Sequence, residues 1–453
     1  MQVRVPRLLK SVPVRCALWV ALCFFLTSAI YLSWFYHLLE LTNGVAADLI
    51  SMGAGYLCQA AGLGLFIWQR DRISFTGAAL LLAVATVPAL VSGSLAGAVI
   101  FGLILNLLCG AVAGHYLYVL ADPVESGRRG LVFGAGYGLS TIAAWLLSLP
   151  GQGRFLRSRY VLPVYLALLA GLALLTPCLR PAEGADVTDK PQPLSDKNLI
   201  LACAAVLLLS LVKNMGFSFP SADVEAGLHM ELSRVFYALG LVAAGIVTDR
   251  SRRHGALCTA AALAIPFIML AVRDEPVSAF VCWSLDYLFY GFFSVFRAVL
   301  FADIAARAHR YALAPLGLLL GRVGDAVGTF LCVALSERKV ALVAATFLLF
   351  LAAVFLFYRL FQAVYEPDTA RQRSEREVFE DFAIQHDLSA REREVLRLVL
   401  AERSNAEIAQ ALFVSESTIK YHMHNLLKKT GCKSRMDLMT RYAAALYPRL
   451  ERG

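Results

Sequence analysis

The sequence predicts an all-α protein, in which a polytopic membrane helix bundle is followed by a small helical domain at the carboxyl terminus. Of its 453 residues, 58% are hydrophobic and only 17% are charged, and the mean hydropathy is +0.64. That is more apolar surface than one water-soluble core can hide. The apolar residues recur in long runs. Charged residues are scarce as far as Phe361 and abundant from Glu366 onward, which marks a domain boundary.

The apolar runs predict about twelve membrane spans. A helix needs roughly 20 residues to cross the roughly 30 Å hydrocarbon core of a bilayer. The expected spans are residues 14–36, 44–68, 75–93, 96–120, 130–149, 160–179, 198–219, 230–248, 255–272, 277–301, 313–335 and 340–361. The first run is too long for a typical signal peptide, so we expect it to be retained as a span. The polar stretch 181–197 is the longest connection and divides the spans into six plus six.

The distribution of Lys and Arg among the connections predicts the orientation, because these residues resist translocation. With the amino terminus inside, the inner connections hold Arg70, Arg72, Arg128, Arg129, Lys190, Lys197, Arg250, Arg252, Arg253, Arg307 and Arg310. One outer loop departs from the rule with Arg154, Arg157 and Arg159. We expect a multi-pass protein of the inner (cytoplasmic) membrane, with both termini in the cytoplasm.

One connecting loop carries a family resemblance. Residues 245–253 read GIVTDRSRR, which is similar to the G-x-x-x-D-R/K-x-x-R/K-R loop of the major facilitator family. Together with the six-plus-six pattern, this resemblance implies a major facilitator fold, although the loop at 68–74 lacks the spaced glycine. The alternative is that Asp249 and the arginines only anchor a helix end at the inner surface. Three glycines at four-residue spacing would let the fifth span pack closely on a neighbour: Gly130, Gly134 and Gly138.

Charged residues inside expected spans need a reason, since each costs roughly 2.5 to 3.5 kcal/mol on insertion scales. The candidates for a ligand site are Lys213, Arg234, Asp286, Arg297, Arg322 and Asp325. Arg322 and Asp325 are three residues apart and could simply neutralise each other. Asp286 and Arg297 share a helix face but lie about 16 Å apart along it. A polar cavity for an unidentified small molecule and purely structural ion pairs both remain open.

The segment from Leu388 contains four short helices according to its capping residues. Serines with a partner three positions later satisfy the free amides at a helix start: Ser389 with Glu392, Ser404 with Glu407, Ser415 with Thr418, and Ser434 with Asp437. Apolar residues follow at helical spacing: Val395, Leu396, Val399, Ile408, Leu412, Ile419, Met423, Leu426 and Leu427. Lys420, Tyr421, His424 and Lys428 fall on the opposite face of the third helix.

This segment resembles the LuxR-type DNA-binding domain. The family pattern L-T-x-R-E-x-x-V-L, S-N-x-x-I-A-x-x-L and S-x-x-T-V-K-x-H is almost unbroken here. The resemblance implies a helix-turn-helix with 404–412 as scaffold helix and 416–430 as recognition helix in the major groove. Two departures put the turn geometry in doubt: Glu402 and Arg403 replace the usual glycine, and Thr430 replaces a leucine.

The same resemblance assigns expected roles on double-stranded DNA. Lys420, Tyr421 and His424 should approach base edges, where a lysine can donate to guanine. Contacts to phosphates, which set register and affinity, are expected from Ser417, Thr418, Asn425, Lys428, Lys429, Lys433 and Arg435. The fourth helix, with Met436, Leu438, Met439 and Tyr442, resembles the family's dimerising helix, so we expect a homodimer on DNA.

These expectations give one leading function. Residues 1–361 would form a membrane sensor domain, 362–387 a charged juxtamembrane linker with a coil-like reach of roughly 28 Å, and 388–453 the DNA-binding domain. The chain would be a membrane-anchored one-component transcription regulator that senses a small molecule. The alternative is a secondary transporter with a regulatory DNA-binding tail. We expect no enzyme, cofactor or metal site, because the sequence has no catalytic set and its cysteines lie mostly in apolar runs without C-x-x-C spacing.

Overall fold

A computed structural model describes residues 11–148, 160–179, 193–217, 230–261 and 276–446. Every regular element in these ranges is a helix. The chain divides into two compact units, Met1–Phe361 and Gln362–Gly453. We call the first the membrane unit and the second the C-terminal unit.

Helices stand at all twelve positions where spans are expected, although the ninth expected span, 255–272, is described only as far as Ala261. They are α1 (Val12–Leu41), α2 (Gly44–Asp48) continuing through a π-helical segment into α3 (Tyr56–Gln69), α4 (Phe75–Val91), α5 (Leu95–Ala121), α6 (Arg129–Ser148), α7 (Val161–Leu179), α8 (Asp196–Phe217), α10 (Met230–Arg250), α11 (Arg252–Ala261), α13 (Pro276–Arg307), α14 (Leu316–Leu335) and α15 (Lys339–Val364). Among the described residues, eight helices are long and apolar enough to cross a membrane, while α4 and α7 give shorter apolar segments. The chain is therefore an all-α, multi-pass membrane protein.

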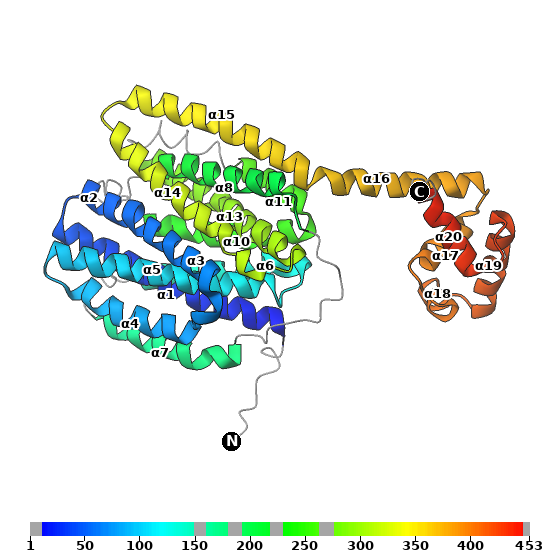
Figure 1. Cartoon of the computed structure of the whole chain (residues 1–453), viewed down its shortest axis with the longest axis horizontal. Helices are drawn as coiled ribbons and strands as arrows, with labels where there is room; N and C mark the ends of the chain where they lie inside the picture. Colours follow the sequence, from blue (N-terminus) through cyan, green and yellow to red (C-terminus); the bar gives the residue numbers. More distant parts are fainter. Residues whose placement is uncertain (1–10, 149–159, 180–192, 218–229, 262–275, 447–453) are drawn as a thin grey trace, which may run out of the picture. The chain divides into compact units, whose positions relative to one another are not determined.

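The two halves of the bundle meet along two helix pairs. α6 of the first half packs on α10 of the second, and α3 packs on α14 (Figure 1). The three spaced glycines allow the first contact, as the sequence predicts. A Cβ at Gly130 would lie 2.7 Å from the carbonyl oxygen of Gly245, and Gly134 and Gly138 face the backbone of Leu241 and Ala238 in the same way. Small residues thus permit direct backbone approach at the contact between the halves.

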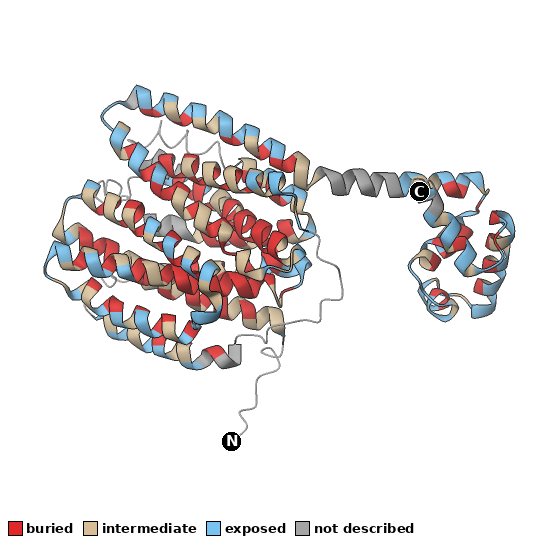
Figure 2. Ribbon diagram, viewed as in Figure 1, coloured by how far each residue is buried: buried red, intermediate tan, exposed pale blue. Residues whose placement is uncertain are grey.

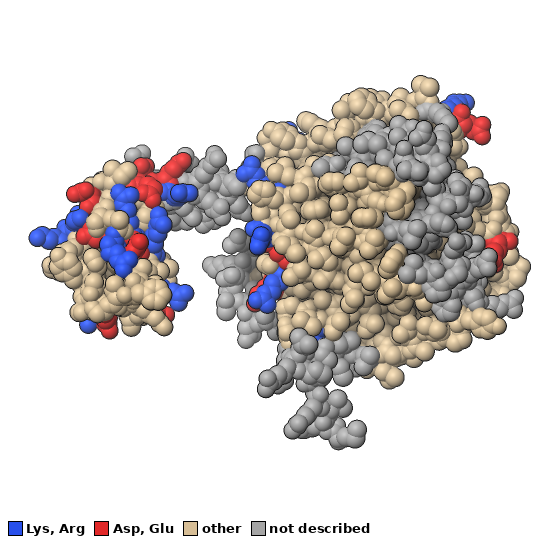
Figure 3. Space-filling model, turned by 180° about the vertical axis from the view of Figure 1, so that it is seen from behind, with Lys and Arg blue, Asp and Glu red and all other residues tan. Residues whose placement is uncertain are grey.

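The membrane unit is buried at its centre and apolar outside. α1, α5 and α13 contribute many of the residues in its interior (Figure 2). Large apolar side chains of α4 and α15 are exposed instead, among them Val84 at 70% and Leu348 at 66%. On the face shown in Figure 3, this unit is almost free of charge over wide areas, whereas charged side chains are spread over the C-terminal unit. An exposed apolar surface of this kind suits contact with lipid.

As far as residue 446, the C-terminal unit consists of five helices around a small apolar core. They are α16 (Glu366–Gln385), α17 (Ala390–Leu400), α18 (Asn405–Ala411), α19 (Glu416–Thr430) and α20 (Arg435–Leu446). The expectation of a coil-like linker was wrong, because most of residues 362–387 form α16. The end of α16 is held by packing: Phe379 and Phe382 are buried, and their rings lie 6.2 and 5.4 Å from that of Tyr442. Tertiary contacts therefore order a segment whose composition suggested only a solvated connector.

Candidate nucleic-acid interface and candidate ligand cavity

Helix α19 presents a polar face to solvent because its opposite face is fixed in the core. Ile419, Met423 and Leu426 are buried, as predicted. The helix starts at Ser415, whose hydroxyl accepts a hydrogen bond from the Thr418 amide at 3.2 Å. It ends at Gly431, whose φ of 67° lies in the left-handed region favoured by glycine. The helix is thus capped at both ends and fixed in rotation.

The outward face of α19 carries four exposed side chains, Lys420, Tyr421, His424 and Lys428. Tyr421 is 64% exposed although it is aromatic. Within the part of the chain that the structure describes, Lys420 pairs with Glu416 at 3.3 Å, and both side chains are at least half exposed. Such surface pairs contribute little and break readily. This face is therefore available for contact with another molecule.

The backbone explains one of the two departures from the family pattern. Glu402, one of the two residues in place of the usual glycine, has a φ of 59°, in the left-handed region. A glycine adopts this conformation without a Cβ clash, whereas other residues are strained. The helix-turn-helix geometry is retained nevertheless, because Ser404 and Glu407 form a complete capping box at the start of α18.

Two of the expected phosphate-binding side chains are engaged within the C-terminal unit. Lys429 Nζ donates to Glu392 Oε2 at 2.8 Å and to the carbonyl of Asp387 at 2.7 Å. Arg435 donates to the carbonyls of Val399 and Arg403. Lys428 and Lys433 are exposed, and their side chains make no hydrogen bond or ion pair with the described residues. All of these DNA contacts remain predictions. The intramolecular hydrogen bonds of Lys429 and Arg435 also stabilise the fold of the C-terminal unit.

Glu392 links α17 to α19 electrostatically. Burial alone would raise the pKa of its carboxyl group, but the hydrogen bonds from Lys429 and Ser389 outweigh burial and hold the pKa below its ordinary value. Its side chain is 5% exposed and accepts from the Ser389 amide at 2.8 Å, which completes the capping box of α17. The ionised form is therefore the one that the fold stabilises.

Inside the membrane unit, a cavity of about 230 Å³ lies between the two halves. Both halves contribute to its wall, and most of its large lining residues are aromatic. The aromatic lining residues are Phe24, Tyr31, Phe35, Tyr36, Tyr56, Tyr116, Tyr137, Tyr237, Trp283, Tyr287 and Tyr290. They were not predicted from the sequence, because an aromatic residue in an apolar span gives no signal of its own.

Four of the six candidate ligand-site residues meet beside this cavity. Asp325 on α14 is fully buried, and its carboxylate lies 2.9 Å from Lys213 Nζ of α8. Arg322 lies 3.6 Å from the same carboxylate and Arg297 of α13 lies 4.0 Å from it. We call Lys213, Arg297, Arg322 and Asp325 the buried charge cluster. The ion pairs and the cavity left open by the sequence are thus both present.

Of the other two candidates, one is buried near this cluster, and the side chain of the other is not described. Asp286 is buried on α13, within electrostatic reach of Lys213, and its Oδ2 has no hydrogen-bond partner among the described residues. Arg234 is on α10, but its side chain lies outside the described residues. From the first half, the ring of Tyr56 lies under the Arg322 guanidinium at 4.2 Å. A cation–π contact of this kind joins the cluster to α3.

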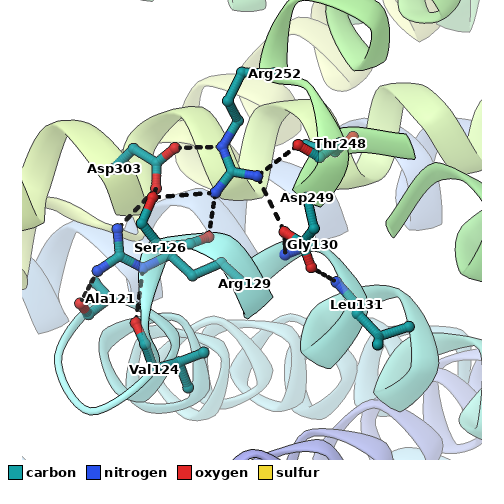
Figure 4. Close-up of polar contacts among 10 residues, drawn as sticks. All are labelled: Ala121, Val124, Ser126, Arg129, Gly130, Leu131, Thr248, Asp249, Arg252 and Asp303. Atoms are coloured by element: carbon teal, nitrogen blue, oxygen red, sulfur yellow. Dashed lines mark hydrogen bonds and ion pairs between the residues drawn. The ribbon is translucent and has the colours of Figure 1, made fainter. Parts of the chain in front are cut away.

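At one end of the bundle, Asp303 on α13 joins the two halves (Figure 4). Arg129, at the start of α6, donates to Asp303 Oδ1 at 2.7 Å. Arg252, at the start of α11, donates to Asp303 Oδ2 at 2.8 Å. From the sequence, an anchor of a helix end by Asp249 and the arginines was the alternative to the major facilitator resemblance. Asp303 was not predicted, because it stands in a long apolar helix.

Asp249 completes this connection by capping α6 from the other half. Its carboxylate accepts from the amides of Gly130 at 2.8 Å and Leu131 at 2.7 Å, and Arg252 lies 3.0 Å from it. A carboxylate is stabilised at a helix amino terminus by the free amides and the helix dipole. We call Arg129, Asp249, Arg252 and Asp303 the inter-half latch.

The latch lies at the end of the bundle from which the chain leaves toward the C-terminal unit. Successive spans alternate in direction, so the start of α6 and the end of α15 belong to the same end. The Arg253 guanidinium beside the latch supports this placement, because it lies 5.6 Å from the ring centre of Phe361. Polar contacts therefore join the two halves at the end of the bundle where α15 ends.

Comparison with known proteins bears on each unit. A solved structure of the human organic anion transporter MFSD10 (TETRAN) matches with a TM-score of 0.54 and 15% identity, and the match covers 78% of this chain and 100% of that one. At this identity the likeness concerns the fold alone. Residues 386–442 match the family of bacterial regulatory proteins, luxR family.

Curated relatives resemble only the end of the chain. The CsgBAC operon transcriptional regulatory protein of Escherichia coli K12 is 48% identical over 53 residues, which are 12% of this chain and 24% of that protein. The spore germination protein GerE of Bacillus subtilis is 44% identical over 48 residues, 11% of this chain and 65% of GerE. The matched segment thus spans about a quarter of the first relative and less than two thirds of the second.

Fold and comparisons together define a class: a polytopic membrane protein with a major-facilitator-like bundle, extended by a helix-turn-helix unit. Within that class, residues 386–442 are a LuxR-family DNA-binding regulator domain. Among the residues that the structure describes, no group of three or more His, Cys, Asp or Glu side chains is placed to hold a metal ion.

Proposed function

We propose that the chain is a membrane-anchored one-component transcription regulator. Its helix-turn-helix binds specific DNA sequences, and a small molecule sensed in the membrane unit controls that binding. The observation that carries the proposal is the exposed face of α19, in a LuxR-family domain joined to a membrane unit with an internal, charged cavity. Because DNA is cytoplasmic, the C-terminal unit faces the cytoplasm from the inner membrane. An even number of spans places the amino terminus on the same side.

On DNA, α19 enters the major groove. Lys420, Tyr421 and His424 read base edges, and Lys428 and Lys433 hold phosphates together with Ser417, Thr418 and Asn425. Lys429 and Arg435 contact phosphates with the N–H donors that their internal hydrogen bonds leave available. α20 supplies the dimer contact, and its exposed Met436 is available for it. Two copies confined to one membrane reach a high local concentration, so a modest change in their separation alters occupancy of paired half-sites.

The DNA interface is tested with the full chain in lipid nanodiscs and DNA fragments selected for binding. Lys420→Ala should reduce discrimination between operator and scrambled DNA by about 1 to 3 kcal/mol, because a base contact is lost. Lys428→Ala is the matched control on the same helix face, and it should weaken both DNAs similarly and lower the salt dependence. Unchanged operator preference in Lys420→Ala would remove this lysine from the base-reading set.

Control by the membrane unit is tested in cells with a reporter gene. Arg297→Ala or Arg322→Ala should abolish the transcriptional response to the ligand while operator binding by the purified chain stays intact. A second candidate function, secondary transport, is favoured by the likeness to a transporter fold. Gradient-driven uptake into vesicles that survives deletion of residues 388–453 would favour transport. Negligible uptake beside measurable binding is the result expected of a sensor.

A further inference from the structure

The wall of the membrane cavity presents positive charge and no negative charge among its lining residues. Lys213 and Arg322 are the lining residues with a full charge, and no Asp or Glu belongs to the lining that the structure describes. Asp325 contacts both of them but does not line the cavity itself. A molecule in the cavity therefore meets two cations directly, with their shared carboxylate behind them.

Among the residues that the structure describes, the charges of the cluster do not balance. Asp325 alone contacts three cations, at 2.9, 3.6 and 4.0 Å. Even when Asp286 is counted as ionised beside Lys213, three cations against two carboxylates leave a net charge of +1. Uncompensated charge in a poorly solvated interior is costly. An anion bound in the cavity would remove that cost.

Donor groups for an anion are present as well. Arg322 Nε is buried and has no hydrogen-bond partner among the described residues. A guanidinium offers donors in a planar fork that matches the two oxygens of a carboxylate. The Arg322 fork is oriented by its contact with the Tyr56 ring, 4.2 Å away. An anion held by Arg322 therefore meets a group with a fixed geometry.

The remainder of the wall suits a flat organic body. Tyr31, Tyr116 and Tyr137 approach from the first half and Tyr237, Trp283 and Tyr290 from the second. Aromatic faces favour stacked or edge contacts with another ring, and tyrosine hydroxyls can bond to polar substituents. The volume of about 230 Å³ is below the roughly 300–1,000 Å³ of pockets for drug-sized molecules. The ligand is therefore small.

We propose that the cavity binds a small aromatic carboxylate, with the carboxylate at Lys213 and Arg322 and the ring between the tyrosines. The inference deepens the proposed sensing function and rests on it for its biological role. The binding itself is a property of the membrane unit. The ligand class can therefore be tested without DNA.

The first test compares molecules of nearly one shape and three charges: benzoate, benzamide and benzamidine. Binding to the full chain in detergent is followed by calorimetry and by the thermal unfolding midpoint, with phenylacetate and phenylacetamide as a longer pair. We expect each carboxylate to bind at least about tenfold more tightly than its amide, and benzamidine not to bind. Amides equal to carboxylates, a preference for benzamidine, or no binding of either carboxylate at millimolar concentration would overturn the proposal.

Acetate and two substitutions separate the two parts of the site. Acetate should bind much more weakly than benzoate, and equal binding would overturn the role of the aromatic wall. Arg322→Gln should weaken benzoate at least about tenfold and Arg322→Lys less, whereas Arg128→Gln, an exposed loop control, should leave binding unchanged. If Arg322→Gln leaves the carboxylate preference intact, the assigned site is wrong.

The proposed ligand class and the proposed control of DNA binding can be refuted independently. If benzoate binds with the expected charge preference but DNA occupancy never responds to any bound carboxylate, the ligand class stands and the sensor function fails. If DNA occupancy responds to a neutral or cationic molecule that competes at this cavity, the sensor function stands and the anion proposal fails. Each experiment therefore addresses one of the two claims.

Discussion

The two units place their charges in opposite ways. In the C-terminal unit, residues such as Val395, Ile408 and Leu426 are fully buried, and the lysines of α19 are exposed. In the membrane unit, Asp325 is fully buried while Val84 is 70% exposed. Water favours the first arrangement and hydrocarbon the second, since lipid offers no hydrogen bonds to a charged group. Both units are helical, so the difference in where charged residues lie comes from the solvent around each unit, water or lipid.

The comparison also shows why similar ion pairs have different worth. Lys420 and Glu416 pair at 3.3 Å on the surface of α19, while Lys213 and Asp325 pair at 2.9 Å inside the bundle. Water screens the first pair, and either partner alone is readily solvated. In the second pair, each partner depends on the other and on the remaining cluster. A buried cluster of this kind is retained only where stability or function requires it.

The largest expected effect tests this difference directly. Asp325→Asn keeps the size of the side chain but leaves Lys213, Arg297 and Arg322 without their shared carboxylate. We expect a loss of about 3 to 5 kcal/mol in the stability of the membrane unit, measured as a lower unfolding midpoint of the full chain in detergent. The matched surface change, Glu416→Gln, should cost less than about 1 kcal/mol. Equal effects would mean that the buried cluster is as well solvated as the surface pair.

The sequence predicted what depends on local patterns. The expected membrane spans follow from apolar length, and the capping boxes at Ser389 and Ser404 follow from spacing along one helix start. The buried charge cluster could be proposed as a set of residues but not assembled, because Lys213 and Asp325 are over a hundred positions apart. Their contact depends on how α8 packs on α14. No local pattern encodes that packing.

Two further features needed the tertiary structure. Asp303 looked like one more residue of a long helix until Arg129 and Arg252 were seen to converge on it. From its composition, α16 was expected to be a solvated connector, because it has few apolar residues. Two of them, Phe379 and Phe382, fix its end by packing on Tyr442, some 60 positions later in the sequence. In both cases the partner is distant in sequence, so composition alone could not reveal the contact.

An intermediate effect concerns Glu392, the charge of the C-terminal unit that most resembles the buried cluster. Its pKa is lowered in the folded state, so its contribution is present above the ordinary value of 4.5 and is lost as the pH falls through the folded value. We expect the stability of this unit to decline as the pH falls below about 4.5, and hydrogen exchange of its amides in the full chain measures that decline. Glu392→Gln should remove part of that decline.

The control for this pH effect is Glu394→Gln, two positions further along α17, whose carboxylate is half exposed and pairs with Arg391 on the surface. It should leave the pH profile close to that of the unchanged chain, because an exposed pair gains little from the fold. A profile of Glu392→Gln that matches the unchanged chain would show that the hydrogen bonds from Lys429 and Ser389 do not favour the ionised form.

The smallest expected effect concerns backbone conformation at an exposed residue, where no buried charge is involved. Glu402 is exposed and has a φ of 59°, which costs a non-glycine residue roughly 1 to 2 kcal/mol. Glu402→Gly removes this strain but adds about 0.4 to 1 kcal/mol of unfolded-state entropy. The C-terminal unit should therefore gain up to about 1 kcal/mol, seen as slower hydrogen exchange of the α17 and α18 amides. Arg403→Gly, at the next position and outside the left-handed region, should instead destabilise the unit. If both glycine substitutions destabilise the unit, contacts of the Glu402 side chain offset the backbone strain at this position. The conformation of this exposed turn would then depend on side-chain contacts as well as on the backbone.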